Sequence, residues 1–167
     1  KEGLIWYLEK VHDEVSKLEK EYSLTIAGNS NGQSLDWLFS KINACKFKDN
    51  ITIIDTPISL EEIYREHTIF INPMLHGAGV KIKTIEAIQK GLAVVSTLKG
   101  IEGTGLRSQV HVLTGKDHNE FRDSLILLLN NFELVRSLSV EAQKYVKKEF
   151  ENTAKLKSYL ESLRVIN

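Results

Sequence analysis

A segment with two close glycines, two lysines and one glutamate is the part of the sequence best suited to bind a ligand. Residues 70–87 read FINPMLHGAGVKIKTIEA. Gly77 and Gly79 stand between a predicted strand end and a predicted helix start, where free backbone amides and the positive helix end attract an anion. Small residues there also let a phosphate approach closely. The competing interpretation is a tight turn that binds nothing, because a lone G-x-G is common.

Two lysines fall in the first turn of the helix predicted over residues 81–90. Cations at a helix N-terminus oppose the helix dipole, at a cost of about 0.3–1 kcal/mol, so Lys81 and Lys83 favour a bound anion. The alternative is an ion-pair ladder, in which Glu86 pairs with Lys83 and Lys90 along the helix. The apolar positions of this helix are expected to face a sheet: Ile82, Ile85 and Ile88.

Histidines and acidic residues give no metal-binding pattern. The five histidines have no ligand spacing, and no D-x-D or other compact oxygen cage is present, so no metal site is predicted. His76 precedes the glycine turn, where an imidazole would donate a hydrogen bond to a phosphate or a sugar. The lone Cys45 is expected to be an inert, small hydrophobic residue.

Short apolar runs alternate with amphipathic patterns along most of the chain. Strands are predicted over residues 24–27, 51–54, 68–72, 92–97 and 110–113. Helices are predicted over 4–22, 35–44, 59–66 with Ser59 and Glu62 as a capping box, 81–90, 121–129, 134–146 and after Asn152. This order predicts a doubly wound α/β domain with a mostly parallel sheet, helices on both faces and a helical C-terminal tail. Ligands of such sheets bind beyond the carboxyl ends of the strands.

Composition narrows the class of protein. The 167 residues suit a single domain, and 42% hydrophobic with 26% charged residues can build a core. Lys plus Arg and Asp plus Glu both total 22, so no basic excess exists for nucleic acid. No apolar run approaches the roughly 18 residues of a transmembrane helix. The lone cysteine and the lack of a signal pattern predict a cytoplasmic location.

The segment from His76 to Thr97, HGAGVKIKTIEAIQKGLAVVST, and the KGIEG that follows carry a resemblance. They resemble the C-terminal, nucleotide-sugar-binding half of GT-B glycosyltransferases, specifically the group 1 or family 4 retaining enzymes. Members have, in order, a glycine-rich turn, a helix with a glutamate followed by Ala, a Gly, a Pro-Val-Val-like strand and a Thr. Ala93 replaces the proline here. The resemblance extends over residues 3–6 and 117–150, and so covers nearly the whole chain.

The resemblance implies roles for residues of this segment. Glu86 would accept hydrogen bonds from the ribose hydroxyls of the donor, and the turn Gly77, Ala78 and Gly79 would face its diphosphate. Lys83, or Lys81, would neutralise that diphosphate as it departs, which makes Lys83 a catalytic candidate. His76 is the other candidate, because of its position before the glycine turn.

The resemblance also implies the borders of the donor pocket. The loop with Thr56 and Ile58 would lie against the nucleobase, while Thr97 and the loop 100–103 would border the pocket. Two departures stand out. Many members have an acidic residue at the position of Ala78, and members begin this domain with a strand, often followed by a basic pair. The chain is therefore expected to be one nucleotide-sugar-binding domain, 1–167, without its first strand and without the N-terminal acceptor domain.

The function expected from the resemblance is transfer of a sugar from a UDP- or GDP-sugar to an acceptor hydroxyl, without a further cofactor. The acceptor would be a glycan or lipid-linked sugar held by the N-terminal domain, in polysaccharide or glycolipid biosynthesis at the inner face of the membrane. The isolated chain would be inactive. A non-catalytic nucleotide-binding or interaction module of the same fold stays open because of Ala78. A signalling receiver is disfavoured, because Ala27-Gly28-Asn29 lacks the paired acids that hold Mg²⁺.

Overall fold

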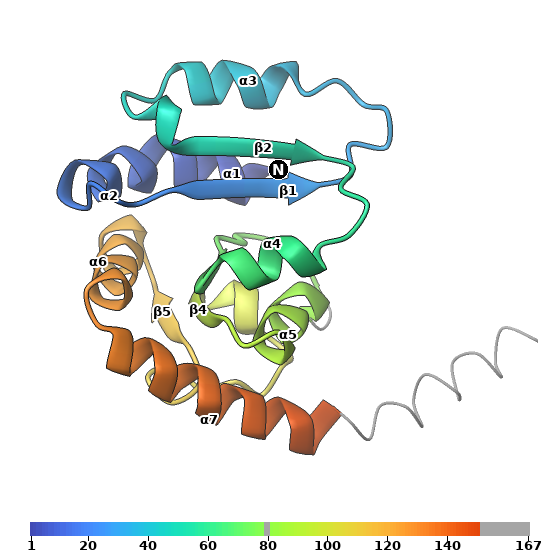
Figure 1. Ribbon diagram of the computed structural model, residues 1–167, viewed down its shortest axis with the longest axis vertical. Helices are drawn as coiled ribbons and strands as arrows, with labels where there is room; N and C mark the ends of the chain where they lie inside the picture. The colour runs from blue at the N-terminus through green and yellow to red at the C-terminus, as the bar shows by residue number, and fades with distance from the viewer. Residues whose placement is uncertain (79–80, 151–167) are drawn as a thin grey trace, which may run out of the picture.

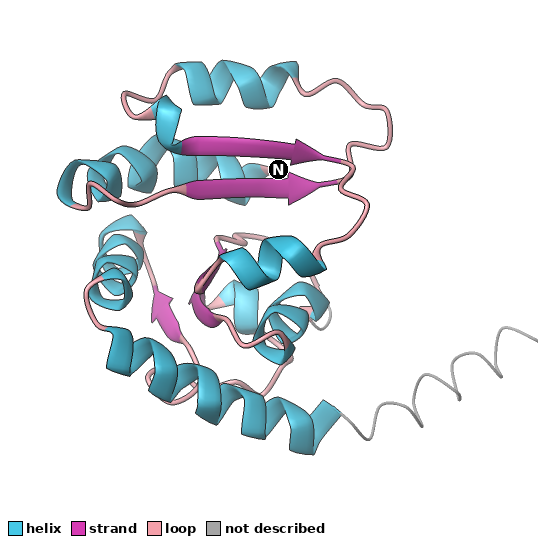
Figure 2. Ribbon diagram, in the orientation of Figure 1, coloured by secondary structure: helices cyan, strands magenta, loops and turns pink. Residues whose placement is uncertain are grey.

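The computed structural model describes residues 1–78 and 81–150. Figure 1 shows its strands in two groups. β1 (Leu24–Gly28) and β2 (Ile51–Asp55) form a two-stranded sheet, and β3 (Ile69–Asn72), β4 (Ala93–Thr97) and β5 (Leu113–Gly115) form a three-stranded sheet in the order β3-β4-β5. All three pairings are parallel, as predicted. The strands nevertheless form two separate sheets, which Figure 2 shows in magenta.

The chain opens with one long helix made of three parts. These are α1 (Glu2–Tyr7), a π-helical turn (Leu8–His12) and α2 (Asp13–Leu18). Of the apolar positions whose spacing predicts this helix, Leu8, Val11 and Val15 are buried, whereas Leu18 is 59% exposed. The predicted end at residue 22 is wrong, since Glu19 already has extended backbone with φ −115° and ψ 95°. Tyr22 is buried for another reason: its phenol oxygen lies 2.6 Å from that of Tyr7.

Five further helices connect and cover the strands. They are α3 (Asp36–Asn43), α4 (Glu61–Glu66), α5 (Ile82–Gln89), α6 (His118–Leu129) and α7 (Phe132–Phe150), with 3-10 turns at Lys48–Asn50 and Lys99–Ile101. α7 runs along the lower edge of the view in Figure 1. None of the helices in the described part of the chain is long and apolar enough to cross a membrane. The predicted helix after Asn152 lies outside the described residues.

β4 lies between two hydrophobic clusters. Ala93 and Val95 join the larger cluster, which contains the first helix, α3 and α6, whereas Val94 joins the smaller one with α5 and α7. Because successive side chains of a strand point to opposite faces, β4 has helices on both faces. The unalternated apolar run is thus explained, and the expected layering of helices on both faces is confirmed at this strand.

The last strand begins later than predicted. Residues 110–113 were expected to form it, but β5 is Leu113–Gly115. The carbonyl oxygen of Arg107 accepts from the amide of His111 at 3.0 Å, and Gln109 has a φ of 63°. This turn occupies the residues that the β-branched pattern assigned to a strand, and it leaves Val110 40% exposed.

Helix caps follow local sequence only in part. Ser59 Oγ accepts from the amide of Glu61 at 3.1 Å, so Ser59 does help to start α4. The reciprocal half of the predicted capping box is not formed within the described residues, where Glu62 makes no side-chain hydrogen bond. α4 consequently begins at Glu61 rather than at Ser59.

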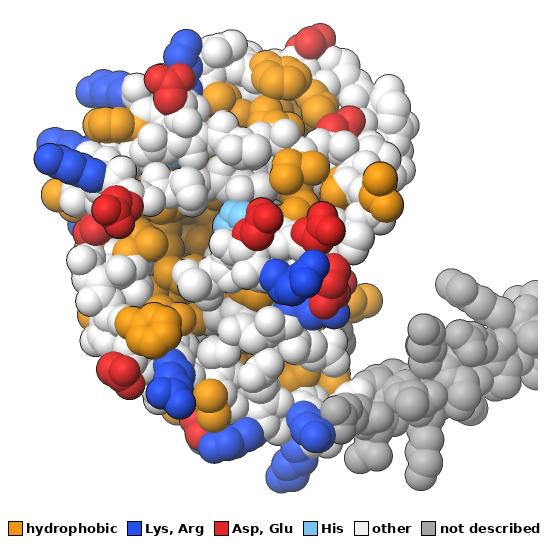
Figure 3. All heavy atoms as spheres, in the orientation of Figure 1, with side chains coloured by type: hydrophobic (Ala, Val, Ile, Leu, Met, Phe, Trp, Pro, Cys, Tyr) orange, Lys and Arg blue, Asp and Glu red, His pale blue; other side chains and the backbone are white. Residues whose placement is uncertain are grey.

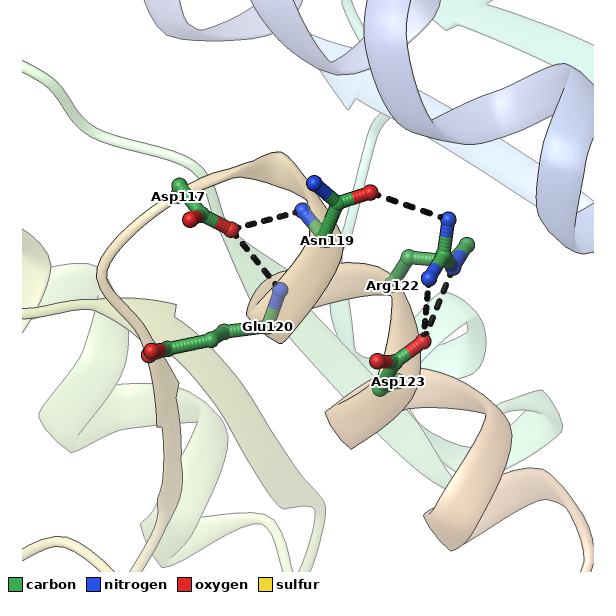
Figure 4. Close-up of polar contacts among 5 residues, drawn as sticks. All are labelled: Asp117, Asn119, Glu120, Arg122 and Asp123. Carbon is green, nitrogen blue, oxygen red and sulfur yellow. Dashed lines mark hydrogen bonds and ion pairs between the residues drawn. The ribbon is translucent and has the colours of Figure 1, made fainter.

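α6 begins three residues earlier than predicted because Asp117 caps it. Its Oδ1 accepts from the amides of Asn119 at 2.8 Å and Glu120 at 2.9 Å (Figure 4). Arg122 lies on the same turn and contacts Asn119 Oδ1 and Asp123 Oδ1. The hydrogen bonds from the two amides hold the pKa of the Asp117 carboxyl below its usual value.

Candidate functional site

The glycine turn lies at the carboxyl end of β3, directly before α5. Gly77 is exposed and has a φ of 124°, a value that side-chain-bearing residues rarely adopt. Its carbonyl oxygen accepts a hydrogen bond from Lys81 Nζ at 3.2 Å. Lys81 is only 5% exposed, so a buried positive charge lies against the turn. Ala78 is exposed, and Gly79 lies outside the described residues.

A polar network joins the end of β3 to β4, to α5 and to the 3-10 turn at Lys99–Ile101. Asn72 Nδ2 donates to Thr84 Oγ1 at 2.8 Å and to the Gly100 carbonyl at 3.0 Å. Thr84 Oγ1 donates to the same carbonyl at 3.2 Å, and Ser96 Oγ donates to the Asn72 carbonyl at 3.2 Å. An ideal Cβ on Gly100 would overlap Ser96 Oγ, so this close approach requires glycine. The network joins the ends of β3 and β4 to the first turn of α5.

Sequence reasoning missed this network. The sequence pattern places Asn72, Thr84 and Ser96 in strands and a helix, but it does not indicate that their side chains meet. A usable signal existed, since Asn72 and Ser96 are polar residues at the ends of apolar strands. A buried polar group requires a hydrogen-bond partner, so such positions predict connections between elements.

Thr97 borders the site, but its hydroxyl is used within the protein. It is 7% exposed. Its Oγ1 donates to the Met74 carbonyl and accepts from the Gly100 amide at 3.0 Å. Thr97 therefore holds the two loops on either side of the site in place.

Glu86 lies one turn into α5 and is half-buried. Within the described part of the chain, its carboxylate makes no hydrogen bond or ion pair. Burial and the negative charge of Glu86 raise the pKa of the Tyr64 phenol. The alternative interpretation, an ion-pair ladder along α5, is wrong for the described residues. Lys90 pairs with Glu61 of α4 instead, and Lys83 is exposed without a carboxylate partner in the described residues.

Two of the three isoleucines of α5 are buried, and the third is exposed to solvent. Ile85 and Ile88 are buried at 6% and 0% exposure, as predicted. Ile82 is 74% exposed, so its prediction is wrong. α5 begins at Ile82, because Lys81 is its non-helical N-cap.

His76 stands in solvent next to the turn. Its Nε2 lies 3.6 Å from Glu2 Oε2, and both side chains are more than 70% exposed (79% and 75%). An exposed pair of this kind contributes little stability. The contact brings the start of α1 beside the glycine turn.

A second loop cluster lies at the carboxyl ends of β1 and β2, around a cavity of about 260 Å³. Asp55 accepts from the amide and the hydroxyl of Ser30, both at 2.9 Å, and these bonds lower the pKa of Asp55. Thr56 has a φ of 51° and donates its amide to the Gly28 carbonyl at 2.7 Å. Ile58, on the same loop, is fully exposed at 108%. The residues predicted to face the nucleobase thus lie on the same sheet edge as the cavity.

Comparison with known sequences matches the chain to one protein family. The model described as "Glycosyl transferases group 1" matches residues 1–131. A protein of Klebsiella pneumoniae, described as "Uncharacterized 44.6 kDa protein in cps region", is 36% identical over 154 residues. The match covers 90% of this chain and 39% of the relative, so the chain spans about two fifths of the relative's length.

Solved structures show the same fold. The C-terminal domain of LpcC, a group 1 glycosyl transferase of Francisella tularensis, superposes with a TM-score of 0.75 at 18% identity, covering 89% of this chain and 79% of that one. Anabaena HepE in complex with UDP-glucose gives 0.75 at 12% identity, with 92% and 44% covered. WaaG, a glycosyltransferase involved in lipopolysaccharide biosynthesis, gives 0.72 at 15% identity, with 94% and 41% covered.

Proposed function

Because the chain belongs to the group 1 glycosyl transferases, we propose that it binds the nucleoside-diphosphate sugar of a retaining hexosyltransferase. The observation that carries the proposal is the half-buried Glu86 carboxylate, which has no partner in the described residues, on the helix that follows the Gly77 turn. A free carboxylate can accept from two vicinal hydroxyls at once, as a ribose offers. The turn supplies the neighbouring place for the diphosphate.

The two lysines have different roles in this proposal. Lys81 Nζ is held by the Gly77 carbonyl and is buried, so it shapes the turn and adds positive charge behind it. Lys83 is exposed and free to reach a diphosphate. A fixed positive charge there stabilises the nucleoside diphosphate as negative charge develops on it.

The reaction needs no base from this chain. The bond from the sugar C1 to the diphosphate oxygen breaks, and the bond from C1 to the acceptor oxygen forms on the same face of the sugar. The acceptor proton passes to the departing phosphate, so atoms and charge balance. The part played by the protein is to hold the donor and to stabilise the leaving group.

The donor is a UDP- or GDP-sugar, and UDP is tried first because HepE was solved with UDP-glucose. The acceptor is a glycan or a lipid-linked sugar, held by a further domain at the inner face of the membrane. The description of WaaG supports polysaccharide or glycolipid biosynthesis as the setting.

Calorimetric titration of the full-length protein with UDP, GDP, ADP and CMP at low salt tests the proposal. One diphosphate should bind saturably, and Glu86→Gln should weaken it about tenfold, the value of one charge-assisted hydrogen bond. Glu133→Gln, on the exposed start of α7, is the matched control and should bind as the unchanged protein does. Equal affinity of the two variants would contradict the role of Glu86.

A non-catalytic module is the second candidate, and Ala78 is the observation that favours it. An exposed methyl group stands where many family members carry a carboxylate. A full-length protein that binds a nucleoside diphosphate but neither transfers nor hydrolyses any UDP- or GDP-sugar would support this candidate.

A further inference from the structure

The last described helix, α7, contacts the end of α5 that lies away from the candidate site. Ser139 Oγ donates to the Gly91 carbonyl at 2.6 Å, and Gln143 Nε2 donates to the Gln89 carbonyl at 3.3 Å. The two helices also share the smaller hydrophobic cluster. Blue Lys and Arg side chains lie along the lower edge of Figure 3, over α7, so the opposite, charged side of this helix faces solvent. α7 therefore holds the end of α5 in place.

Further along α7, Tyr145 reaches the loop that connects β4 to β5. Its hydroxyl donates to the Thr104 carbonyl at 3.2 Å. Its ring stacks on the ring of His111, with centroids 4.5 Å apart, and His111 is only 6% exposed. His111 Nδ1 in turn accepts from the Arg107 amide at 3.1 Å. Tyr145 thus contacts two separate parts of this loop.

The loop passes so close to the Tyr145 hydroxyl that residue 105 has no room for a side chain. An ideal Cβ on Gly105 would lie 2.0 Å from the Tyr145 oxygen. Gly105 also has a φ of 72°, in the region that favours glycine. The backbone conformation and the close approach both require glycine here, so the path of the loop is matched to Tyr145.

From Thr104, a run of hydrogen bonds leads to the start of α5. The amide and Oγ1 of Thr104 both donate to the Ile101 carbonyl, at 3.1 and 2.5 Å. Ile101 follows Gly100, whose carbonyl accepts from Thr84 Oγ1 at 3.2 Å. Thr84 is buried in the first turn of α5, two residues before Glu86. These contacts join Tyr145 of α7 to the part of α5 that carries the candidate site.

We propose that Tyr145 is a positioning residue for the candidate site. Its hydroxyl holds the turn 100–104, and through that turn it sets the first turn of α5, from which Lys83 and Glu86 contact a nucleoside diphosphate. This role rests on the proposed function of these two residues. Groups that contact a ligand depend on the residues that hold them, so Tyr145 affects affinity without touching the ligand.

Amide hydrogen exchange of the full-length protein without nucleotide tests whether Tyr145 holds the turn. Tyr145→Phe keeps the ring on His111 and removes only the hydroxyl. The Gly100 and Thr104 amides should then exchange about three- to tenfold faster, because opening of the turn no longer breaks one neutral hydrogen bond. Tyr7→Phe is the matched control. It also removes one phenol hydroxyl, but in the larger hydrophobic cluster, and should leave both exchange rates unchanged.

Calorimetric titration with UDP and GDP tests whether the turn sets affinity. At a temperature where all variants are folded, Tyr145→Phe should bind the preferred diphosphate about three- to tenfold more weakly. Tyr7→Phe should bind as the unchanged protein does, although it is less stable. Thr104→Val removes the next side-chain contact and should act as Tyr145→Phe does. The double variant should lose less than the product of the two factors, because both changes act through the same turn.

Three results would overturn the inference. The first is unchanged exchange of the Gly100 and Thr104 amides in Tyr145→Phe. The second is faster exchange with undiminished affinity. The third is equal weakening by Tyr7→Phe, which would make the effect one of overall stability. An unchanged protein that binds no nucleoside diphosphate would instead contradict the proposed function, and the exchange rates alone would then decide whether Tyr145 holds the turn.

Discussion

The phenol oxygens of Tyr7 and Tyr22 lie 2.6 Å apart in the core, so the first helix and the chain that leads into β1 share one buried hydrogen bond. Each hydroxyl satisfies the other, and burial raises the pKa of both phenols. Neither hydroxyl can be removed without consequence for its partner.

Tyr7→Phe leaves the Tyr22 hydroxyl buried without its partner and should lower the free energy of unfolding by about 1–3 kcal/mol. Tyr22→Phe should have a similar effect. The double variant should lose less than the sum of the two, because no orphaned hydroxyl remains. Urea unfolding of the four proteins measures the coupling. Strict additivity would show that the two hydroxyls do not depend on each other.

Gly3→Ala should destabilise the protein by about 1–3 kcal/mol, because the added methyl group overlaps the Pro73 carbonyl oxygen. The direction is informative, since alanine in a helix ordinarily stabilises relative to glycine. Gly28→Ala is the control: nothing lies within 4 Å of its ideal Cβ. Denaturant midpoints compare the two. A Gly3→Ala protein as stable as the unchanged one would refute the tight contact between α1 and the end of β3.

Stability should fall as the pH drops from 7.5 to 5.5. Burial lowers the pKa of His12, whose Nε2 contacts the Phe47 carbonyl at 3.0 Å, and burial likewise lowers the pKa of His111. The unfolded chain therefore takes up protons below its own pKa, about 6.5, before the native state does. The free energy that the neutral, buried histidines contribute to folding is fully present above about pH 6.5. It is lost as the pH falls toward their lower pKa in the native state. Urea titrations at both pH values measure it.

Two variants test whether His12 causes the fall in stability between pH 7.5 and 5.5. His12→Gln should flatten the decline between pH 7.5 and 5.5, although it lowers stability overall. His76→Gln should leave the slope unchanged, because the His76 side chain is 79% exposed. The window avoids the carboxyl groups, whose unperturbed pKa values lie near 4. A His12→Gln protein with an undiminished slope would move the origin of the effect to another residue.

Lys83→Gln should weaken binding of the preferred nucleoside diphosphate to the full-length protein about tenfold, and the loss should shrink as salt is added. Lys48→Gln, before the amino end of β2 and away from the carboxyl edge, is the charge-matched control. Lys81→Met should also weaken binding, but with a disturbed Gly77 turn that is visible in the amide spectrum. Calorimetry at two salt concentrations separates the roles of the two lysines.

Asp117→Ala should lower the melting temperature by about 2–4 °C, because the first amides of α6 lose their acceptor. Asp117→Asn keeps an acceptor oxygen and should retain most of the stability. The low pKa of Asp117 means that its contribution is present above pH 4 and is lost as the pH falls further. Thermal scans at pH 7 and pH 3 should therefore show a smaller alanine effect at the lower pH.

The parts of the fold that depend on local pattern could be predicted from the sequence. β4 is a continuous buried run, and Ile85 and Ile88 repeat at helical spacing, so period and burial point to the same structure. The last strand was misplaced because the turn at Arg107 is set by backbone hydrogen bonds that the pattern of Val110–Leu113 does not reveal.

The places of the candidate residues in the fold were predictable where they depend on local pattern. Gly77 follows β3 and Glu86 lies in α5, as the pattern indicates, while their roles stay predictions. The separate behaviour of the two lysines was not predictable, because burial of Lys81 depends on the path of the turn. The contacts of Asn72 depend on β4 and α5 together, so no local window contains them.

Trp6 and Tyr7 both pack edge-on against Phe121, with ring centroids 5.5 and 5.9 Å apart. The ribosome makes the first helix about 115 residues before its aromatic partner Phe121 on α6. At about 5–20 residues per second, roughly 6–23 s separate their synthesis. During that interval the apolar stripe of the nascent helix has no partner on α6. The first helix is therefore where we expect a ribosome-associated chaperone to bind the emerging chain.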